Sequence, residues 1–132
     1  MNKTIFNTVI AGIGSICTYM FGGWDTPLMV LVIFMATDYG TGLISAWINN
    51  KVNSKIGYRG IAKKGLILIV LIVAVLLDRL LNKNIWVFRT LVCYFYVANE
   101  GISILENCGK CGVQLPQKLL DTLEQLKNKE GK

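Results

Sequence analysis

The chain has 132 residues, of which 53% are hydrophobic, and it carries a formal net charge of +6. Histidine is absent, which excludes catalysis by a histidine acid or base and metal sites built on imidazole. The basic residues are not interleaved with aromatic ones as in nucleic-acid-binding proteins, so we expect no nucleic-acid partner and favour an anionic membrane surface. The long apolar blocks predict an all-α integral membrane protein.

The first two apolar segments predict two membrane helices joined by a turn. Residues 5–22 follow Lys3, carry no charge and contain small residues that permit close helix packing. Because these residues also lower its hydrophobicity, three spans rather than four are expected if this segment lies at the interface. A Gly-Gly-Trp turn follows. Pro27 then opens a second predicted span at residues 27–48, long enough to cross a hydrocarbon core of about 30 Å.

One face of this second span is small and polar. Asp38 is its only charged residue and lies near its middle, with Thr41, Gly42 and Ser45 beside it at helical spacing. A charged side chain in a bilayer costs about 2.5–3.5 kcal/mol on insertion scales. No basic partner is expected at the depth of Asp38. It is therefore either protonated and hydrogen-bonded to Thr41 or a neighbouring helix, or it faces water after assembly.

Residues 49–64 are the most basic segment and contain no acidic residue. The two glycines at positions 57 and 60 predict a loop rather than a helix. A third span is predicted at residues 61–81, with its first two lysines reaching one interface and its last charged residues marking the other. The positive residues of this predicted cytoplasmic loop are Lys51, Lys55, Arg59, Lys63 and Lys64.

A fourth span is predicted at residues 85–105, with Arg89 close to its start. Since Asp78 ends the third span at the same boundary, we expect Asp78 and Arg89 to form an ion pair. Both termini and the basic segment then lie on one side of the membrane. The positive-inside rule places that side in the cytoplasm.

The end of the fourth span is polar. Asn99, Glu100 and Ser103 share one broad helical face near the predicted inner boundary. Lys64 lies at the same boundary on the preceding span. We therefore expect an ion pair between Lys64 and Glu100 that locks the two helices together on the cytoplasmic side.

The last part of the chain differs from the rest. Cys108 and Cys111 form a lone CxxC, which is too few ligands for a structural zinc site and lacks a thioredoxin-like context. Residues 1–112 are expected to form the transmembrane domain. Residues 113–132 are expected to form a cytoplasmic tail containing a short amphipathic helix that lies on the membrane or pairs with other copies.

Several motifs occur together in a recognisable order. They are Asp38-Tyr-Gly-Thr41-Gly42, Ser54-x-x-Gly57-x-x-Gly60-x-x-x-Lys64, the run from Asn99 to Asn107, then Gly109, Gly112-Val113, Leu115-Pro116 and a leucine-rich tail. In these motifs the chain resembles the phage holin family of the toxin secretion/phage lysis type, over residues 25–128. Cys108 and Cys111 depart from the family pattern, where small or apolar residues are more frequent, and this favours inert thiols.

The resemblance implies a protein that catalyses no reaction, needs no cofactor, and forms homo-oligomers in the bacterial cytoplasmic membrane. Holes would open late in a phage lytic programme, and an endolysin or a toxin would pass outward as cargo without a specific contact. A small multi-span transporter or channel subunit and an antiholin-type regulator are the alternatives. A small drug/proton antiporter would need a carboxylate in its first span, and this chain has none there.

Overall fold

The computed structural model describes residues 2–83 and 85–130, and within these ranges every element of secondary structure is an α-helix. This confirms the all-α membrane fold class expected from the sequence. The helices are α1 (Lys3–Phe21), α2 (Thr26–Ile48), α3 (Ser54–Leu81), α4 (Phe88–Lys110) and α5 (Gln117–Glu130).

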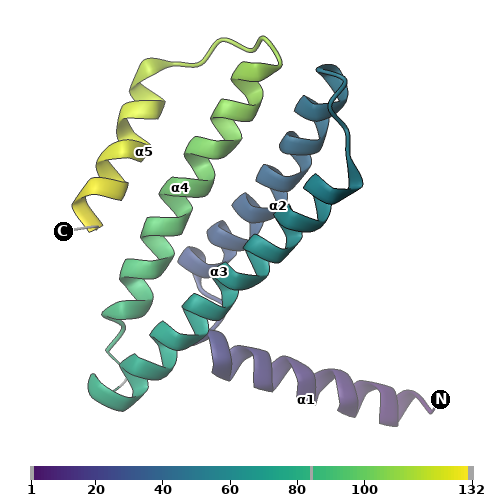
Figure 1. Cartoon of the computed structure of the whole chain (residues 1–132). Helices are drawn as coiled ribbons and strands as arrows, with labels where there is room; N and C mark the ends of the chain where they lie inside the picture. Colours follow the sequence, from purple (N-terminus) through teal and green to yellow (C-terminus); the bar gives the residue numbers. More distant parts are fainter. Residues whose placement is uncertain (1, 84, 131–132) are drawn as a thin grey trace.

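Helices α2, α3 and α4 form a bundle, and the other two helices differ in how they join it (Figure 1). The largest helix–helix interface is between α2 and α4, which run parallel to each other and antiparallel to α3. Helix α5 folds back along α4. Helix α1 extends away from the bundle, and none of its described residues is buried.

Short polar side chains begin three of the helices. Asn2 caps α1 by accepting a hydrogen bond from the backbone N–H of Thr4, and Asn53 caps α3 in the same way. Asp25 caps α2, which has a proline in its first turn. These residues accept bonds from the backbone N–H groups that a helix leaves free at its start, which fixes where each helix begins.

The prediction that residues 49–64 form a loop was wrong for most of that segment. Helix α3 begins at Ser54 and passes through Gly57 and Gly60 without a break. A Cβ atom on Gly57 would lie 3.2 Å from the hydroxyl of Tyr39, and one on Gly60 would lie 3.4 Å from its ring. The two glycines therefore provide the space in which the Tyr39 ring of α2 packs against α3, and this contact offsets their low helix propensity.

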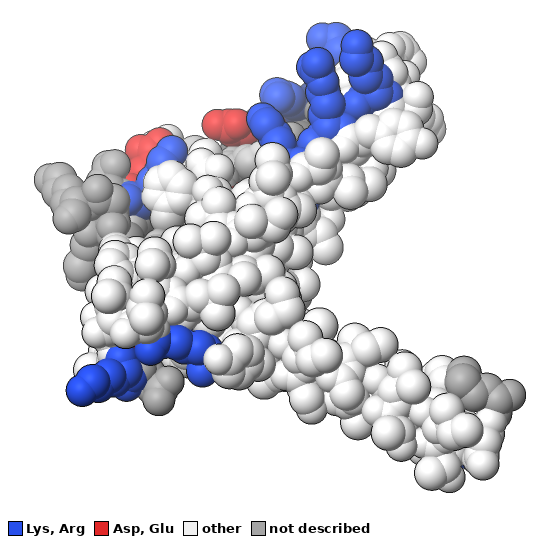
Figure 2. Space-filling model, turned by 60° about the horizontal axis from the view of Figure 1, so that its bottom comes forward, with Lys and Arg blue, Asp and Glu red and all other residues white. Residues whose placement is uncertain are grey.

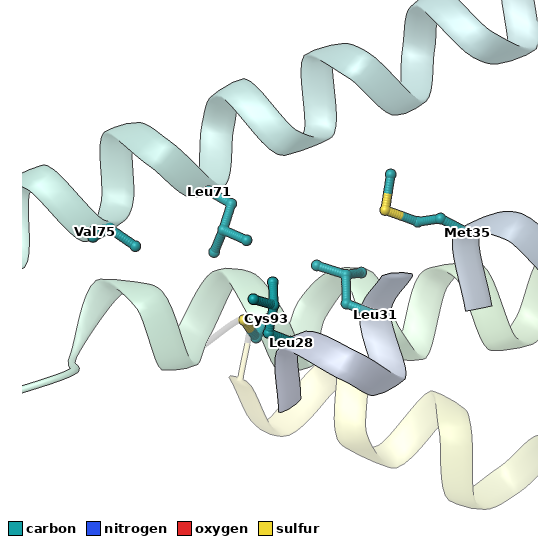
Figure 3. Packing of buried hydrophobic residues seen from close by; sticks show 6 residues of the cluster. All are labelled: Leu28, Leu31, Met35, Leu71, Val75 and Cys93. Carbon is teal, nitrogen blue, oxygen red and sulfur yellow. The ribbon is translucent and has the colours of Figure 1, made fainter. Parts of the chain in front are cut away.

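The apolar core lies in the middle of the bundle, between α2, α3 and α4 (Figure 3). Leu31, Leu71, Val75 and Cys93 have no exposed surface, and Leu28 retains only 1%. At about 1.5–3 kcal/mol for each fully buried large apolar side chain, this small cluster is a main source of cohesion between the three helices.

Three helices, α1, α2 and α3, are long and apolar enough to cross a membrane by length and composition. Helix α4, which the sequence predicts as the fourth span, is not among them. Helix α4 is less apolar than the other three, because Arg89, Asn99 and Glu100 lie within it. Arg89 and Glu100 are nevertheless buried inside the bundle, so α4 hides part of its polarity from its surroundings.

Helix α5 is part of the packed structure rather than a separate tail. A Cβ atom on Gly101 of α4 would lie 3.1 Å from the Leu123 side chain and 3.1 Å from the Phe34 side chain. The absence of a side chain at Gly101 thus allows α5 and α2 to approach α4 at the same point. Lys127 of α5 lies nearer the start of α4, and its Nζ is 3.5 Å from the amide oxygen of Asn99.

Candidate functional site

The bundle contains a largely buried group of charged side chains centred on Lys64 of α3. The Lys64 ammonium donates hydrogen bonds to Asp38 Oδ2 at 2.7 Å and to Glu100 Oε2 at 2.9 Å. The side chains of Lys64, Asp38 and Glu100 are 17%, 15% and 5% exposed. One cation therefore joins all three helices of the bundle, and the structure brings together Lys64 and Glu100, as the sequence suggested.

The expectation that Asp38 has no basic partner needs correction. Counting along the sequence placed Asp38 near the middle of α2 and Lys64 at the boundary of its span, yet Lys64 Nζ reaches Asp38 directly. The long, flexible lysine stem makes this reach possible. The amide of Asn107 on α4 also donates to the other carboxylate oxygen of Asp38 at 3.0 Å, and to the Thr41 hydroxyl at 3.0 Å.

We call Lys64, Asp38, Glu100, Asn107 and Thr41 the Lys64 cluster. It is extended by polar or small residues that do not contact Lys64 directly. Gly42 lies beside the Asn107 amide. Ser103 and Asn99 line a cleft next to the cluster, which is described below. The buried Ser45 accepts hydrogen bonds from the side chain of Asn49.

A second charged group lies at the other end of the bundle, around Arg89. The guanidinium of this buried side chain forms two hydrogen bonds with the carboxylate of Asp25, at 2.8 and 2.9 Å. It also donates to the backbone carbonyls of Phe21 and Gly23 at 2.7 and 3.0 Å. Such a two-point contact between guanidinium and carboxylate is strong and directional, so Arg89 fixes the turn between α1 and α2 against α4.

The predicted ion pair between the Asp78 and Arg89 side chains was wrong, because Asp78 binds the backbone of Arg89 and not its guanidinium. The Asp78 carboxylate accepts from the backbone N–H groups of Phe88 and Arg89, at 2.9 and 2.8 Å, and from the side chain of Asn82. The first turn of α4 has free N–H groups and a positive dipole end, both of which favour a carboxylate. Asp78 therefore caps α4, and the guanidinium turns to Asp25. We call Arg89, Asp25, Asp78, Phe21 and Gly23 the Arg89 cluster.

Gly22 makes the Arg89 cluster possible. Its φ of +82° lies in the left-handed region, where glycine alone is unstrained. A Cβ atom at this position would lie 2.8 Å from Arg89 Nε. The neighbouring Arg79 donates to the carbonyl of Tyr19 at 2.8 Å and stacks over the Tyr19 ring, which ties the end of α1 to α3.

The hydrogen bond from Arg89 holds the pKa of the Asp25 carboxyl below its usual value, with smaller contributions from the Leu28 backbone N–H. Asp25 lies in the turn just before α2, and its side chain is 45% exposed. Since the charged form is the one that binds Arg89, this contact is present at neutral pH and is lost as the pH falls through the lowered pKa of Asp25.

A cleft of about 580 Å³ opens between α2, α3 and α4, next to the Lys64 cluster. Asp38, Lys64 and Glu100 lie on its wall, and Lys51 and Lys63 contribute basic side chains to it. Lys55 and Arg59 are exposed on α3 but do not line the cleft. Figure 2 shows that basic side chains gather at the end of the bundle where α3 begins.

Among the described residues, no group of three or more histidine, cysteine or acidic side chains is arranged to hold a metal ion. The four cysteines are free thiols; Cys93 is buried in the core, and the other three are partly exposed.

Three contributors to these sites were missed at the sequence level. Asp25 caps α2 and is also the partner of Arg89, and nothing in the spacing indicates this second role. Asn107 ends the polar run that begins at Asn99, and within this run a contact was predicted only for Glu100. The contact of Tyr39 was not predicted, because Gly57 and Gly60, which leave space for its ring, are typical of a loop.

Comparison with known proteins gives a consistent picture. The sequence profile of the bacteriophage holin family matches residues 15–128. An uncharacterised protein of Clostridium acetobutylicum is 52% identical over 125 residues, covering 95% of this chain and 100% of the relative. An uncharacterised 14.9 kDa protein of Clostridium perfringens is 54% identical over 121 residues, covering 92% of each chain.

A more distant relative has a functional name. A probable holin of Bacillus phage phi105 is 34% identical over 111 residues, covering 83% of this chain and 80% of the relative. No solved structure matches the chain at a significant level. The profile match covers most of the sequence, and the chain therefore belongs to the bacteriophage holin family, whose members are non-enzymatic membrane proteins.

Proposed function

We propose that this chain is a holin, which accumulates in the cytoplasmic membrane of a bacterium, self-associates and opens holes through which a cell-wall hydrolase or a toxin leaves. Two features of the molecule support this function beyond family membership. The first is how its polar groups lie relative to the expected bilayer, and the second is a polar side on an otherwise apolar bundle.

The expected position in the bilayer follows from α2. Trp24 and Trp47 lie at its two ends and are 55% and 72% exposed. Tryptophan favours the membrane–water interface, and these two residues are about 34 Å apart along a helix that rises about 1.5 Å per residue. That distance matches a hydrocarbon core of about 30 Å. On this placement the Arg89 cluster lies at one interface, and the Lys64 cluster lies about 14 Å inside the other.

The observation that carries the proposal is the outer face of α5. Leu120, Leu123 and Leu126 turn towards the bundle and are partly buried, whereas the opposite face is exposed and polar. The polar residues of α5 described as exposed are Gln117, Lys118, Asp121, Thr122, Glu124 and Gln125, and Leu119 is the exposed apolar residue beside them. Because Leu123 packs at the level of Gly101, beside buried Glu100, this polar face extends to the depth of the Lys64 cluster.

Charged side chains at that depth cannot face lipid without a large cost. Several copies that turn their α5 faces towards one another would surround water, whereas one chain of 132 residues is too small to enclose a hole. The remaining exterior suits lipid or neighbouring subunits. Helix α1 extends from the bundle with exposed residues such as Ile10, Ile13 and Ile16, which are 54%, 55% and 62% exposed.

The orientation that we propose places the N-terminus and the connection between α4 and α5 in the cytoplasm, with α5 folding back along α4 from that side. Lys51, Lys55, Arg59 and Lys63 are exposed at one end of the bundle, where α2 ends and α3 begins. Anionic lipid and the positive-inside rule both favour this end on the cytoplasmic side. The inner leaflet then surrounds the Lys64 cluster, and four helices, α1 to α4, cross the bilayer.

The test is inducible expression of the full chain in a bacterial host that lacks any phage hydrolase. We expect an abrupt loss of membrane potential and the entry of a normally excluded dye, followed by lysis only when a cell-wall hydrolase is also made. A matched variant, Glu124→Leu with Gln125→Leu, removes polarity from the α5 face and should insert without opening holes.

Other outcomes would support other functions. A chain that inserts and leaves the membrane intact, yet delays lysis by a second holin, would act as an antiholin-type regulator. Export of a small cation without dye entry would indicate a transporter or channel subunit. Either outcome would contradict the holin assignment.

A further inference from the structure

The cleft between α2, α3 and α4 has the chemistry of a site for an amphiphile, and nothing in the hole-forming role requires it. Helix α3 packs against α4 through Leu71, Val75 and their neighbours, and its first half then diverges from α4 (Figure 3). Lys64 joins this half of α3 to Glu100 of α4, and Tyr39 of α2 packs against Gly57 and Gly60 of α3. What remains between the helices is the cleft of about 580 Å³.

The lining of the cleft changes along its length. Lys51 and Asn53, in the connection between α2 and α3, lie at the end that faces the basic surface, and Lys63 contributes a further ammonium group. Leu66, Ile67 and Val70 line the part that leads towards the apolar core. A ligand with an anionic head and an apolar tail matches this order of side chains.

We propose that the cleft binds one anionic phospholipid of the inner leaflet. Its phosphate would lie near Lys51 and Lys63, and an acyl chain would follow Leu66, Ile67 and Val70 towards the middle of the bilayer. The volume accommodates a headgroup and the upper part of a chain, not a whole lipid, so the rest of the tail remains in the membrane. The orientation of the lipid depends on the proposed function, whereas the existence of the site does not.

Charge favours this ligand over a zwitterionic lipid or a second protein copy. The segment 49–64 carries five basic residues and no acidic one. Asp38 and Glu100, the two carboxylates on the wall of the cleft, are already hydrogen-bonded to Lys64. Among the described residues Lys51 and Lys63 form no ion pair, so their ammonium groups can bind an anion. The described part of α5, which carries the acidic side chains of the tail, packs on α4 and not at this cleft.

The chain offers a matched control for the test. The double variant Lys51→Gln/Lys63→Gln removes two charges that line the cleft. Lys55→Gln/Arg59→Gln removes two charges from the same basic surface that do not line it. Both variants change the net charge equally, so only a built site distinguishes them. A third variant, Ala46→Trp, fills the cleft without changing any charge.

The measurement is native mass spectrometry of the detergent-purified full chain with phosphatidylglycerol, or with phosphatidylcholine of the same acyl chains. We expect one phosphatidylglycerol to be retained per chain. Its affinity should fall about tenfold in Lys51→Gln/Lys63→Gln and change less than about twofold in Lys55→Gln/Arg59→Gln. Ala46→Trp should also lose the lipid while keeping its helical circular dichroism.

Equal losses in the two charge variants, equal retention of both lipids, or unchanged binding by Ala46→Trp would overturn the proposal. Displacement of the lipid by free glycerol phosphate would also overturn it, because the site would then recognise the phosphate alone. Hole formation is not the readout. Lipid binding without permeabilisation would contradict only the holin assignment, and permeabilisation without lipid binding would contradict only this site.

Discussion

Lys64 is the residue whose removal should disturb the bundle most. The variant Lys64→Met keeps most of the side chain but removes the ammonium that lies 2.7 and 2.9 Å from the Asp38 and Glu100 carboxylates, which then lack their shared cation. Removing one partner of a fully buried ion pair costs about 3–5 kcal/mol, whereas an exposed pair contributes about 0–1 kcal/mol.

The exposure of the three side chains, 5–17%, places the Lys64 cluster nearer the buried limit. We therefore expect Lys64→Met to lower the free energy of unfolding by about 2–4 kcal/mol. Replacing the carboxylates as well, in Lys64→Met/Asp38→Asn/Glu100→Gln, removes the uncompensated charge and should recover at least half of that loss. Lys55→Met, an exposed lysine on the same helix, should change stability by less than about 0.5 kcal/mol.

Cys93 supplies the assay. It is fully buried in the core, so a thiol-reactive fluorophore labels it only when the bundle opens. With Cys17, Cys108 and Cys111 replaced by serine, labelling during a detergent or thermal titration reports unfolding. The reasoning would be refuted if Lys64→Met were as stable as the parent protein, or if the triple variant were no more stable than Lys64→Met alone.

Three further predictions concern the other packed contacts. Gly22→Ala should destabilise the protein by about 2 kcal/mol or more, because the new Cβ meets Arg89 and the backbone has a positive φ; equal stability in the Cys93 assay would contradict this. The folded-state pKa of Asp25 is lowered by Arg89, so this contact stabilises above the unfolded value of about 3.9 and is lost as pH falls through the folded value. The free energy of unfolding, measured from pH 6 to pH 2.5, should fall at acid pH in the parent protein and not in Asp25→Asn. Parallel profiles of the two proteins would count against the role of Asp25. Gly101→Ala should loosen α5 and expose it to limited proteolysis, and Leu123→Ala in the same chain should restore protection by making room for the new methyl group; no rescue would mean that α5 does not pack there.

The sequence predicted the apolar framework well because its signals are local. Pro27 and the long apolar run after it indicate α2, and the helix begins within one residue of the prediction. The amphipathic pattern after Pro116 likewise indicates α5. What this pattern could not predict is that α5 folds back on α4, because the docking depends on the space left at Gly101 by residues of three helices.

The partners of charged residues were harder to predict than the helices. Depth counted from the ends of each span brought Lys64 near Glu100 but separated it from Asp38, since a lysine side chain extends about a turn of helix from its own Cα. Depth also predicted that Arg89 pairs with Asp78, since both lie at the same boundary. In the structure, two backbone N–H groups in the first turn of α4 bind the Asp78 carboxylate instead. Such competition is visible only when the tertiary contacts are known.

The most direct test of the hole-forming role uses the purified full chain in vesicles that contain anionic lipid and an enclosed dye. If the α5 face surrounds water, the parent protein should release the dye without any other protein, and Glu124→Leu/Gln125→Leu should insert equally well and release little. No release by the parent protein would contradict the holin assignment, and full release by the variant would contradict the role of α5.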